Sequence, residues 1–210
     1  MESLIQTGVT NLRDSSHVSW SVVAFLGLVI YVYAVEVERR RWDVVAAGLA
    51  FILVDVFNEL VNSAIPHWGG SAPLWAVTGT TSYLILVGWC IEIVFLFAIS
   101  GIVFVKLLPA DRAARILGIP NRWFFTAMWS CISVFVEVLL HRAGIFQWHY
   151  RWWGEGLGLI PIVVFGYATF FATAAVIFDM TSDRRRFTVV GAMAATDIVL
   201  AVIFGLAGWL

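Results

Sequence analysis

Six apolar runs divide this 210-residue chain and constrain its fold more than any other feature. They cover residues 18–36, 44–65, 81–107, 122–142, 157–179 and 187–209. Each is close to or above the ~20 residues that cross the ~30 Å core of a bilayer as an α-helix. Only 13% of the residues are charged, whereas a soluble domain has about 25%. The sequence therefore predicts an all-α polytopic membrane protein, residues 1–210 forming one bundle of six transmembrane helices.

Most basic residues fall in the connections on one side of the predicted bundle. Ten of the 13 Lys and Arg residues lie there, and three lie on the other side. The ten are Arg39, Arg40, Arg41, Lys106, Arg112, Arg115, Arg122, Arg184, Arg185 and Arg186. Such an excess in short loops marks the cytoplasmic side. We therefore expect a multi-pass protein of the cell (inner or plasma) membrane, with both termini on the outer side.

Acidic and amide side chains interrupt the second run, in the segment "DVFNELVNS" at residues 55–63. Asp55, Glu59 and Asn62 are spaced i, i+4 and i+7, which places them on one face of a helix. No Lys or Arg lies near them in the sequence to neutralise the acids. Because a charged side chain inside a bilayer costs several kcal/mol, such residues usually mark a functional site.

Glutamates in three consecutive runs are predicted to share one depth in the membrane. Counted at 1.5 Å per residue, Glu59, Glu92 and Glu137 lie roughly 21–22 Å above the inner interface. His141 follows Glu137 by four residues and therefore lies one turn above it. We expect these glutamates to line one polar pocket. The candidate catalytic residues are Glu59, Glu92, Glu137, Asn58, Asn62 and His141.

Acids gathered in a low-dielectric site without Lys or Arg must either hold protons or bind a cation. In the first case a neutral carboxyl can act as a general acid and an ionised one as a base. Such a pair can protonate an alkene or epoxide, and aromatic side chains can stabilise the resulting cation. The candidate substrate-binding residues are Asp55, Trp89, Trp148, His149, Tyr150 and Tyr167, some of them in a loop that could fold over the site.

Other functions are compatible with the same residues. Glu59, Glu92, Glu137 and His141 could instead hold a divalent metal such as Fe, Mn or Mg, in a metal-dependent oxidoreductase or hydrolase. Intramembrane acids also occur in transporters coupled to protons or cations, and the chain could be a lipid-binding subunit. The expected partners are the bilayer and a lipid-soluble substrate, with a homo-oligomer left open. No basic stripe suits a nucleic acid.

The segment "EVLLHRAGIFQWHYRWWGEGLGLIP", residues 137–161, resembles a stretch of small polytopic carotenoid cyclases and hydratases. Glu137, Gly144, Tyr150, Gly158 and Pro161 follow the order found there. That family has paired acids after the proline, where this chain reads "PIVVFGY". The resemblance therefore carries over only Glu137. It implies an isoprenoid substrate and an acid–base reaction such as cyclisation, hydration or isomerisation.

Overall fold

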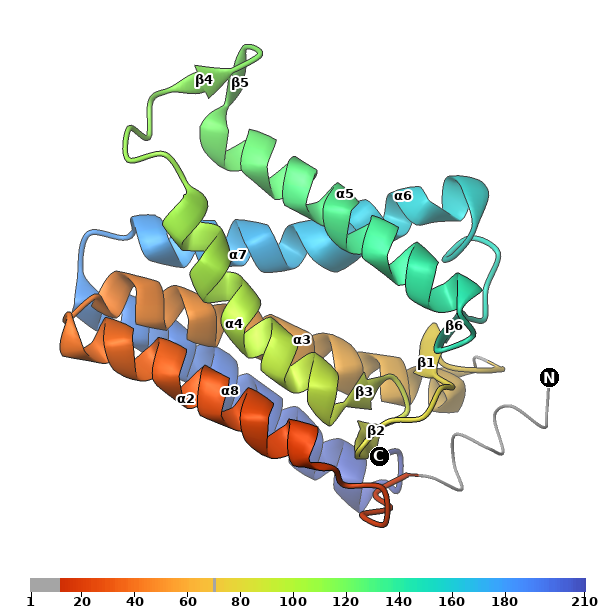
Figure 1. The fold of residues 1–210 in the computed structure, drawn as a ribbon. Coiled ribbons are helices and arrows are strands. Elements are labelled where there is room, and N and C mark those ends of the chain that lie inside the picture. Colours follow the sequence, from red (N-terminus) through yellow and green to blue (C-terminus); the bar gives the residue numbers. More distant parts are fainter. Residues whose placement is uncertain (1–11, 70) are drawn as a thin grey trace.

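The computed structural model describes residues 12–69 and 71–210, and most of this part of the chain is helical (Figure 1). The long helices are α2 (Trp20–Glu38), α3 (Trp42–Ala64), α4 (Ile91–Leu107), α5 (Asn121–Arg142), α7 (Ala168–Asp179) and α8 (Asp183–Leu206). Short helical segments are η1 (Ile65–Trp68), η2 (Gly156–Gly158), α6 (Leu159–Pro161) and η3 (Ile162–Tyr167). The strands are β1 (Trp75–Val77), β2 (Leu84–Leu86), β3 (Trp89–Cys90), β4 (Arg115–Ile116), β5 (Ile119–Pro120) and β6 (Phe146–Trp148).

Within the described residues, five helical segments are long and apolar enough to cross a membrane. They are Trp20–Glu38, Trp42–Trp68, Asn121–Arg142, Gly156–Asp179 and Asp183–Leu206. The remaining long helix, α4, has 17 residues, which corresponds to about 25 Å. The structure thus agrees with a helical multi-pass architecture, while the count of six membrane crossings and the side of the termini remain predictions.

The third apolar run departs from its prediction. We expected one helix over residues 81–107, but α4 begins only at Ile91, because residues 84–90 form the β2–β3 hairpin. A short apolar run such as "LILVGWC" has no periodicity that separates a buried strand from a helix. Gly88 also packs against other parts of the chain, since a Cβ there would lie 2.5 Å from the Trp75 ring. In this run, residues 84–90 are therefore a hairpin and residues 91–107 are a helix.

Helix α3 lies at the centre of the bundle and packs against α4, α7 and α8 (Figure 1). Gly48 and Gly101 allow a close approach of α3 to α4, because a Cβ on Gly101 would lie 3.1 Å from the Gly48 Cα atom. Phe51 of α3 contacts the rings of Phe97, Phe170 and Phe171 in the main apolar core.

Ion pairs fasten the end of the bundle at which the 39–41, 108–120 and 180–182 connections lie (Figure 1). The Arg122 guanidinium donates to both Asp179 carboxylate oxygens, at 2.9 and 3.0 Å. Lys106 pairs with the buried Glu36. The connections predicted to carry the excess of basic residues therefore meet at one end of the bundle.

The strand pairs β1–β6 and β2–β3, together called the strand cover, lie at the opposite end of the bundle (Figure 1). Antiparallel pairing of β1 with β6 places Trp75 opposite Trp148, and the β2–β3 hairpin lies next to it (Figure 1). The buried Asn62 side chain of α3 holds this cover in place. Its Oδ1 atom accepts from the backbone N–H groups of Leu74 (2.8 Å) and Trp75 (3.3 Å). Its Nδ2 atom donates to the Trp75 carbonyl at 2.9 Å.

Candidate functional site

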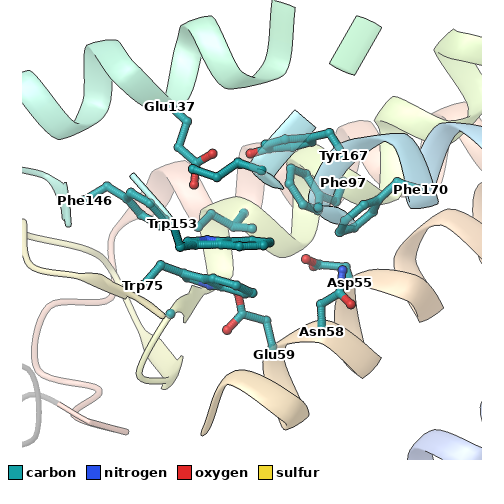
Figure 2. Close-up of a pocket in the computed structure, with 14 residues that line it drawn as sticks. Asp55, Asn58, Glu59, Trp75, Phe97, Glu137, Phe146, Trp153, Tyr167 and Phe170 are labelled. Atoms are coloured by element: carbon teal, nitrogen blue, oxygen red, sulfur yellow. The ribbon is translucent and has the colours of Figure 1, made fainter. Parts of the chain in front are cut away.

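A cavity lies beneath the strand cover, between α3, α4, α5 and η3 (Figure 2). About 60 Å³ of it is open to the centres of water molecules, and one water needs ~10–15 Å³ by this measure. The cavity therefore has room for a few waters or for the end group of a larger molecule. Three acids, Asp55, Glu59 and Glu137, share its wall with the aromatic residues Trp75, Phe97, Phe146, Trp153, Tyr167 and Phe170.

Each acid accepts a hydrogen bond from a tryptophan of the strand cover. The Trp75 indole N–H donates to Glu59 Oε1 at 2.7 Å, and that of Trp148 donates to Glu137 Oε1 at 3.3 Å. The Trp89 indole N–H donates to Asp55 Oδ2 at 2.7 Å. The helices thus supply the acids, and β1, β6 and β3 supply the donors that orient them.

Three buried polar atoms on the cavity wall have no hydrogen-bond partner among the described residues. They are Glu59 Oε2, Glu137 Oε2 and the indole nitrogen of Trp153. The three side chains are only 4%, 8% and 8% exposed. Buried polar atoms are nearly always satisfied, so these three indicate a place for a water or a ligand.

Stacked tryptophans separate the two glutamates. The rings of Trp75 and Trp153 lie 5.8 Å apart with an interplanar angle of 23°. In Figure 2, Glu137 lies on one side of this stack and Glu59 on the other. The two carboxyl groups therefore approach the cavity from different directions.

Helix η3 is a π-helical segment, and it forms another part of the wall. π-helical turns are rare and frequently occur at functional sites. The wide turn places Ile162, Gly166 and Tyr167 on the cavity. A Cβ atom on Gly166 would lie 3.7 Å from the Trp153 ring, an ordinary contact distance. The missing side chain at Gly166 therefore leaves space beside Trp153.

The structure brings together only part of the predicted site. Asp55, Asn58, Glu59, Glu137 and Tyr167 line the cavity. The predicted substrate-binding residues Trp89 and Trp148 act through their indole N–H groups on two of these acids.

Glu92 does not join the other glutamates, contrary to the prediction. It lies in the first turn of α4 and accepts hydrogen bonds from the Thr81 hydroxyl (2.5 Å) and the Ser82 N–H (2.8 Å). The depth estimate was counted from the inner end of the run and gave only a height, whereas Thr81 and Ser82 in the segment before α4 hold the carboxylate away from the other glutamates. Asn62 is likewise not at the cavity, because its side chain anchors the β1 backbone.

Three residues of the predicted lid and its surroundings bind backbone carbonyls rather than face the cavity. His141 Nδ1 lies 3.0 Å from the Phe146 carbonyl oxygen, and His149 Nδ1 lies 3.0 Å from that of Pro73. The Tyr150 hydroxyl donates to the Ala72 carbonyl at 2.8 Å. Burial lowers the pKa of His149, so its imidazole is neutral at pH 7.

The predicted metal site does not form. Nowhere in residues 12–69 and 71–210 do three His, Cys, Asp or Glu side chains come close enough to hold a metal ion. Glu92 and His141 are held by other partners, and the tryptophan stack lies between Glu59 and Glu137 (Figure 2). The set Glu59, Glu92, Glu137 and His141 is therefore wrong as a first coordination shell.

The sequence analysis did not identify Trp75 and Trp153 as residues of the site. They reach the cavity because β1 pairs with β6 across a long sequence separation. Neither residue lies in a periodic apolar pattern that would have indicated this role.

Comparisons with known proteins agree with a membrane location. Residues 2–206 match a family described as "Uncharacterized membrane protein family". The chain is also 41% identical over 200 residues to an "Uncharacterized protein" of Archaeoglobus fulgidus, covering 95% of this chain and 94% of that protein. No solved structure matches the chain.

Proposed function

Since the chain belongs to this uncharacterized family of membrane proteins, we propose that it is an integral membrane enzyme. It transfers protons to and from a lipid-soluble substrate at Glu59 and Glu137. One observation carries the proposal. Each glutamate has one carboxyl oxygen held by an indole N–H, and the other oxygen is buried and unpartnered at the wall of one cavity.

Two carboxyl groups that reach a cavity from different sides can divide the work of an acid and a base. One gives a proton to the substrate, and the other takes a proton from a different atom. Fixed indole donors keep each carboxyl in position through both steps. The expected reactions are cyclisation or isomerisation, which need only proton transfer, or hydration, in which a water molecule adds to the protonated substrate.

Aromatic rings around the acids favour a reaction that develops positive charge. Trp75, Trp153, Phe97 and Phe170 line the cavity, and the faces of such rings attract cations. Among the described residues, no Lys or Arg lines the cavity wall to oppose that charge. A lipid or isoprenoid alkene, which becomes a carbocation when it is protonated, suits these surroundings.

Access from the bilayer fits a lipid-soluble substrate. The cavity is enclosed by helices whose outer surfaces are apolar. Helix α5, for example, exposes Ile132, Phe135, Val136 and Leu139. Small cavity volume means that the end group of the substrate, rather than the whole chain, enters between the acids. The rest of the substrate would remain among the helices or in the lipid.

The test compares lipid extracts from cells that express the wild type, Glu59→Gln or Glu137→Gln. Glutamine keeps the shape of the side chain but cannot exchange a proton. Untargeted mass spectrometry and chromatography, which resolves isomers of equal mass, should show a lipid product in the wild type. Loss of acid–base catalysis is worth about 10²–10⁴-fold, so both variants should lack it.

A matched control is Glu155→Gln, because this carboxyl lies on the surface of the strand-covered end with its side chain 78% exposed. It should form the product like the wild type. All four proteins must reach the membrane in equal amounts. If both glutamine variants at the cavity still form the product, the proposal of proton transfer at these residues is wrong.

A further inference from the structure

Trp153 has an unexplained hydrogen-bond donor. Its ring is 8% exposed and packs against Trp75, yet its indole nitrogen has no acceptor among the described residues. The three other tryptophans of the strand cover discussed above all donate to carboxyl groups. An indole N–H can only donate, so among the described residues this donor is left free for an acceptor atom of a water or a ligand.

The same cavity contains two further unpartnered atoms, Glu59 Oε2 and Glu137 Oε2. A ligand group that satisfies all of them must both accept and donate hydrogen bonds. A hydroxyl group can satisfy two of the three atoms, because its oxygen accepts from the Trp153 indole while its single proton is donated to one carboxyl oxygen. An aldehyde can only accept, and a hydrocarbon can do neither.

We propose that Trp153 binds the hydroxyl group of a lipid-soluble alcohol and so determines which ligands the cavity accepts. The aromatic wall receives the carbon atoms next to the hydroxyl, and the cavity of about 60 Å³ suits such an end group. Gly166 provides the space, since its Cα lies beside the Trp153 ring with no side chain between them. The inference rests on the proposed function only in taking the ligand to be lipid-soluble.

Binding can be tested without knowing the natural substrate. Tritiated farnesol is bound to the purified full-length protein in detergent micelles and displaced by farnesol, farnesal or farnesene. These three probes share a C15 prenyl chain and differ in the end group. One buried hydrogen bond is worth roughly three- to tenfold in affinity. The wild type should therefore bind farnesol most tightly, farnesal less and farnesene least.

Trp153→Phe keeps an aromatic ring in the stack and removes the donor. It should weaken farnesol and farnesal by about three- to tenfold and leave farnesene unchanged. Trp152→Phe is the matched control, because Trp152 is 58% exposed and its neighbour in sequence. It should not alter the order of the three probes.

Gly166→Ala gives an independent readout if the Trp153 variant does not fold. The added methyl makes only ordinary contacts with the protein but takes up space in the cavity, so it should weaken all three probes together. Unchanged binding in this variant would show that the probes bind elsewhere and would overturn the proposal.

Two other results would also overturn it. Equal affinity for the alcohol and the hydrocarbon would mean that the cavity does not recognise a hydroxyl. Affinities for farnesol and farnesal that are unchanged in Trp153→Phe would mean that Trp153 donates to a structural water instead. Both results are independent of the turnover test, because Glu59→Gln and Glu137→Gln can abolish the reaction whether or not Trp153 recognises an oxygen.

Discussion

Replacement of Asn62 by alanine is expected to release strand β1 from helix α3. Asn62 is completely buried and makes three hydrogen bonds to the β1 segment, at 2.8, 3.3 and 2.9 Å. The substitution leaves two backbone N–H groups and one carbonyl without partners. Each such group costs about 1–3 kcal/mol, which gives about 3–9 kcal/mol. We expect about 3–5 kcal/mol, because water can reach part of the released segment.

A shift of this size is measurable as a change in melting temperature. For a chain of this length 1 kcal/mol corresponds to about 2–4 °C, so Asn62→Ala should lower the melting temperature in detergent by roughly 10 °C. Asn58→Ala is the matched control, one helical turn away on the same helix. Asn58 lines the cavity and makes no hydrogen bond to the strand cover, so it should change little. Equal shifts for both variants would refute the assignment of Asn62 as the anchor.

Three further predictions concern other contacts. Gly88→Ala would place a Cβ atom 2.5 Å from the Trp75 ring and 2.7 Å from a Glu59 carboxyl oxygen, so the free energy of unfolding should fall by about 1–3 kcal/mol. Gly166→Ala, the control, should unfold like the wild type, and equal losses in the two variants would contradict this explanation. Arg122→Lys removes a bidentate ion pair with Asp179 and should lower the free energy of unfolding by about 1–2 kcal/mol. An unchanged melting temperature would show that the ion pair does not stabilise the protein. Burial raises the pKa of the Cys90 thiol to about 11, so mass spectrometry should find it unlabelled by maleimide at about pH 8. Rapid labelling at that pH would refute its burial.

Hydropathy alone predicted most of the helical architecture. The runs at 18–36, 122–142 and 187–209 correspond closely to α2, α5 and α8, because a helix must satisfy its own backbone in a bilayer. The same reasoning predicted that Glu59 and Glu137 line one pocket, since they lie at similar depths on two predicted helices that run in the same direction. It failed for the third run, where tertiary contacts of Gly88 favour a hairpin over a helix.

The strand cover could not be predicted from local patterns. Trp75 and Trp148 face each other only because β1 and β6 pair, and a pairing so distant in sequence leaves no periodic signal. Asn58 and Asn62 illustrate the same limit. Helical spacing put them on adjacent turns, but only the path of the following loop decides that one faces the cavity and the other binds backbone.

Because Glu59 and Glu137 depend on the indole donors of Trp75 and Trp148, the order of synthesis determines when the site can form. Glu59 belongs to a helix that enters the membrane early, and Trp75 follows it directly. Glu137 must wait for Trp148, and β1 has no partner strand until β6 has been made. The cavity therefore cannot be completed until β6 and the η3 segment that lines it have been made. A nascent chain that stalls after α5 would contain Glu137 without its indole donor Trp148.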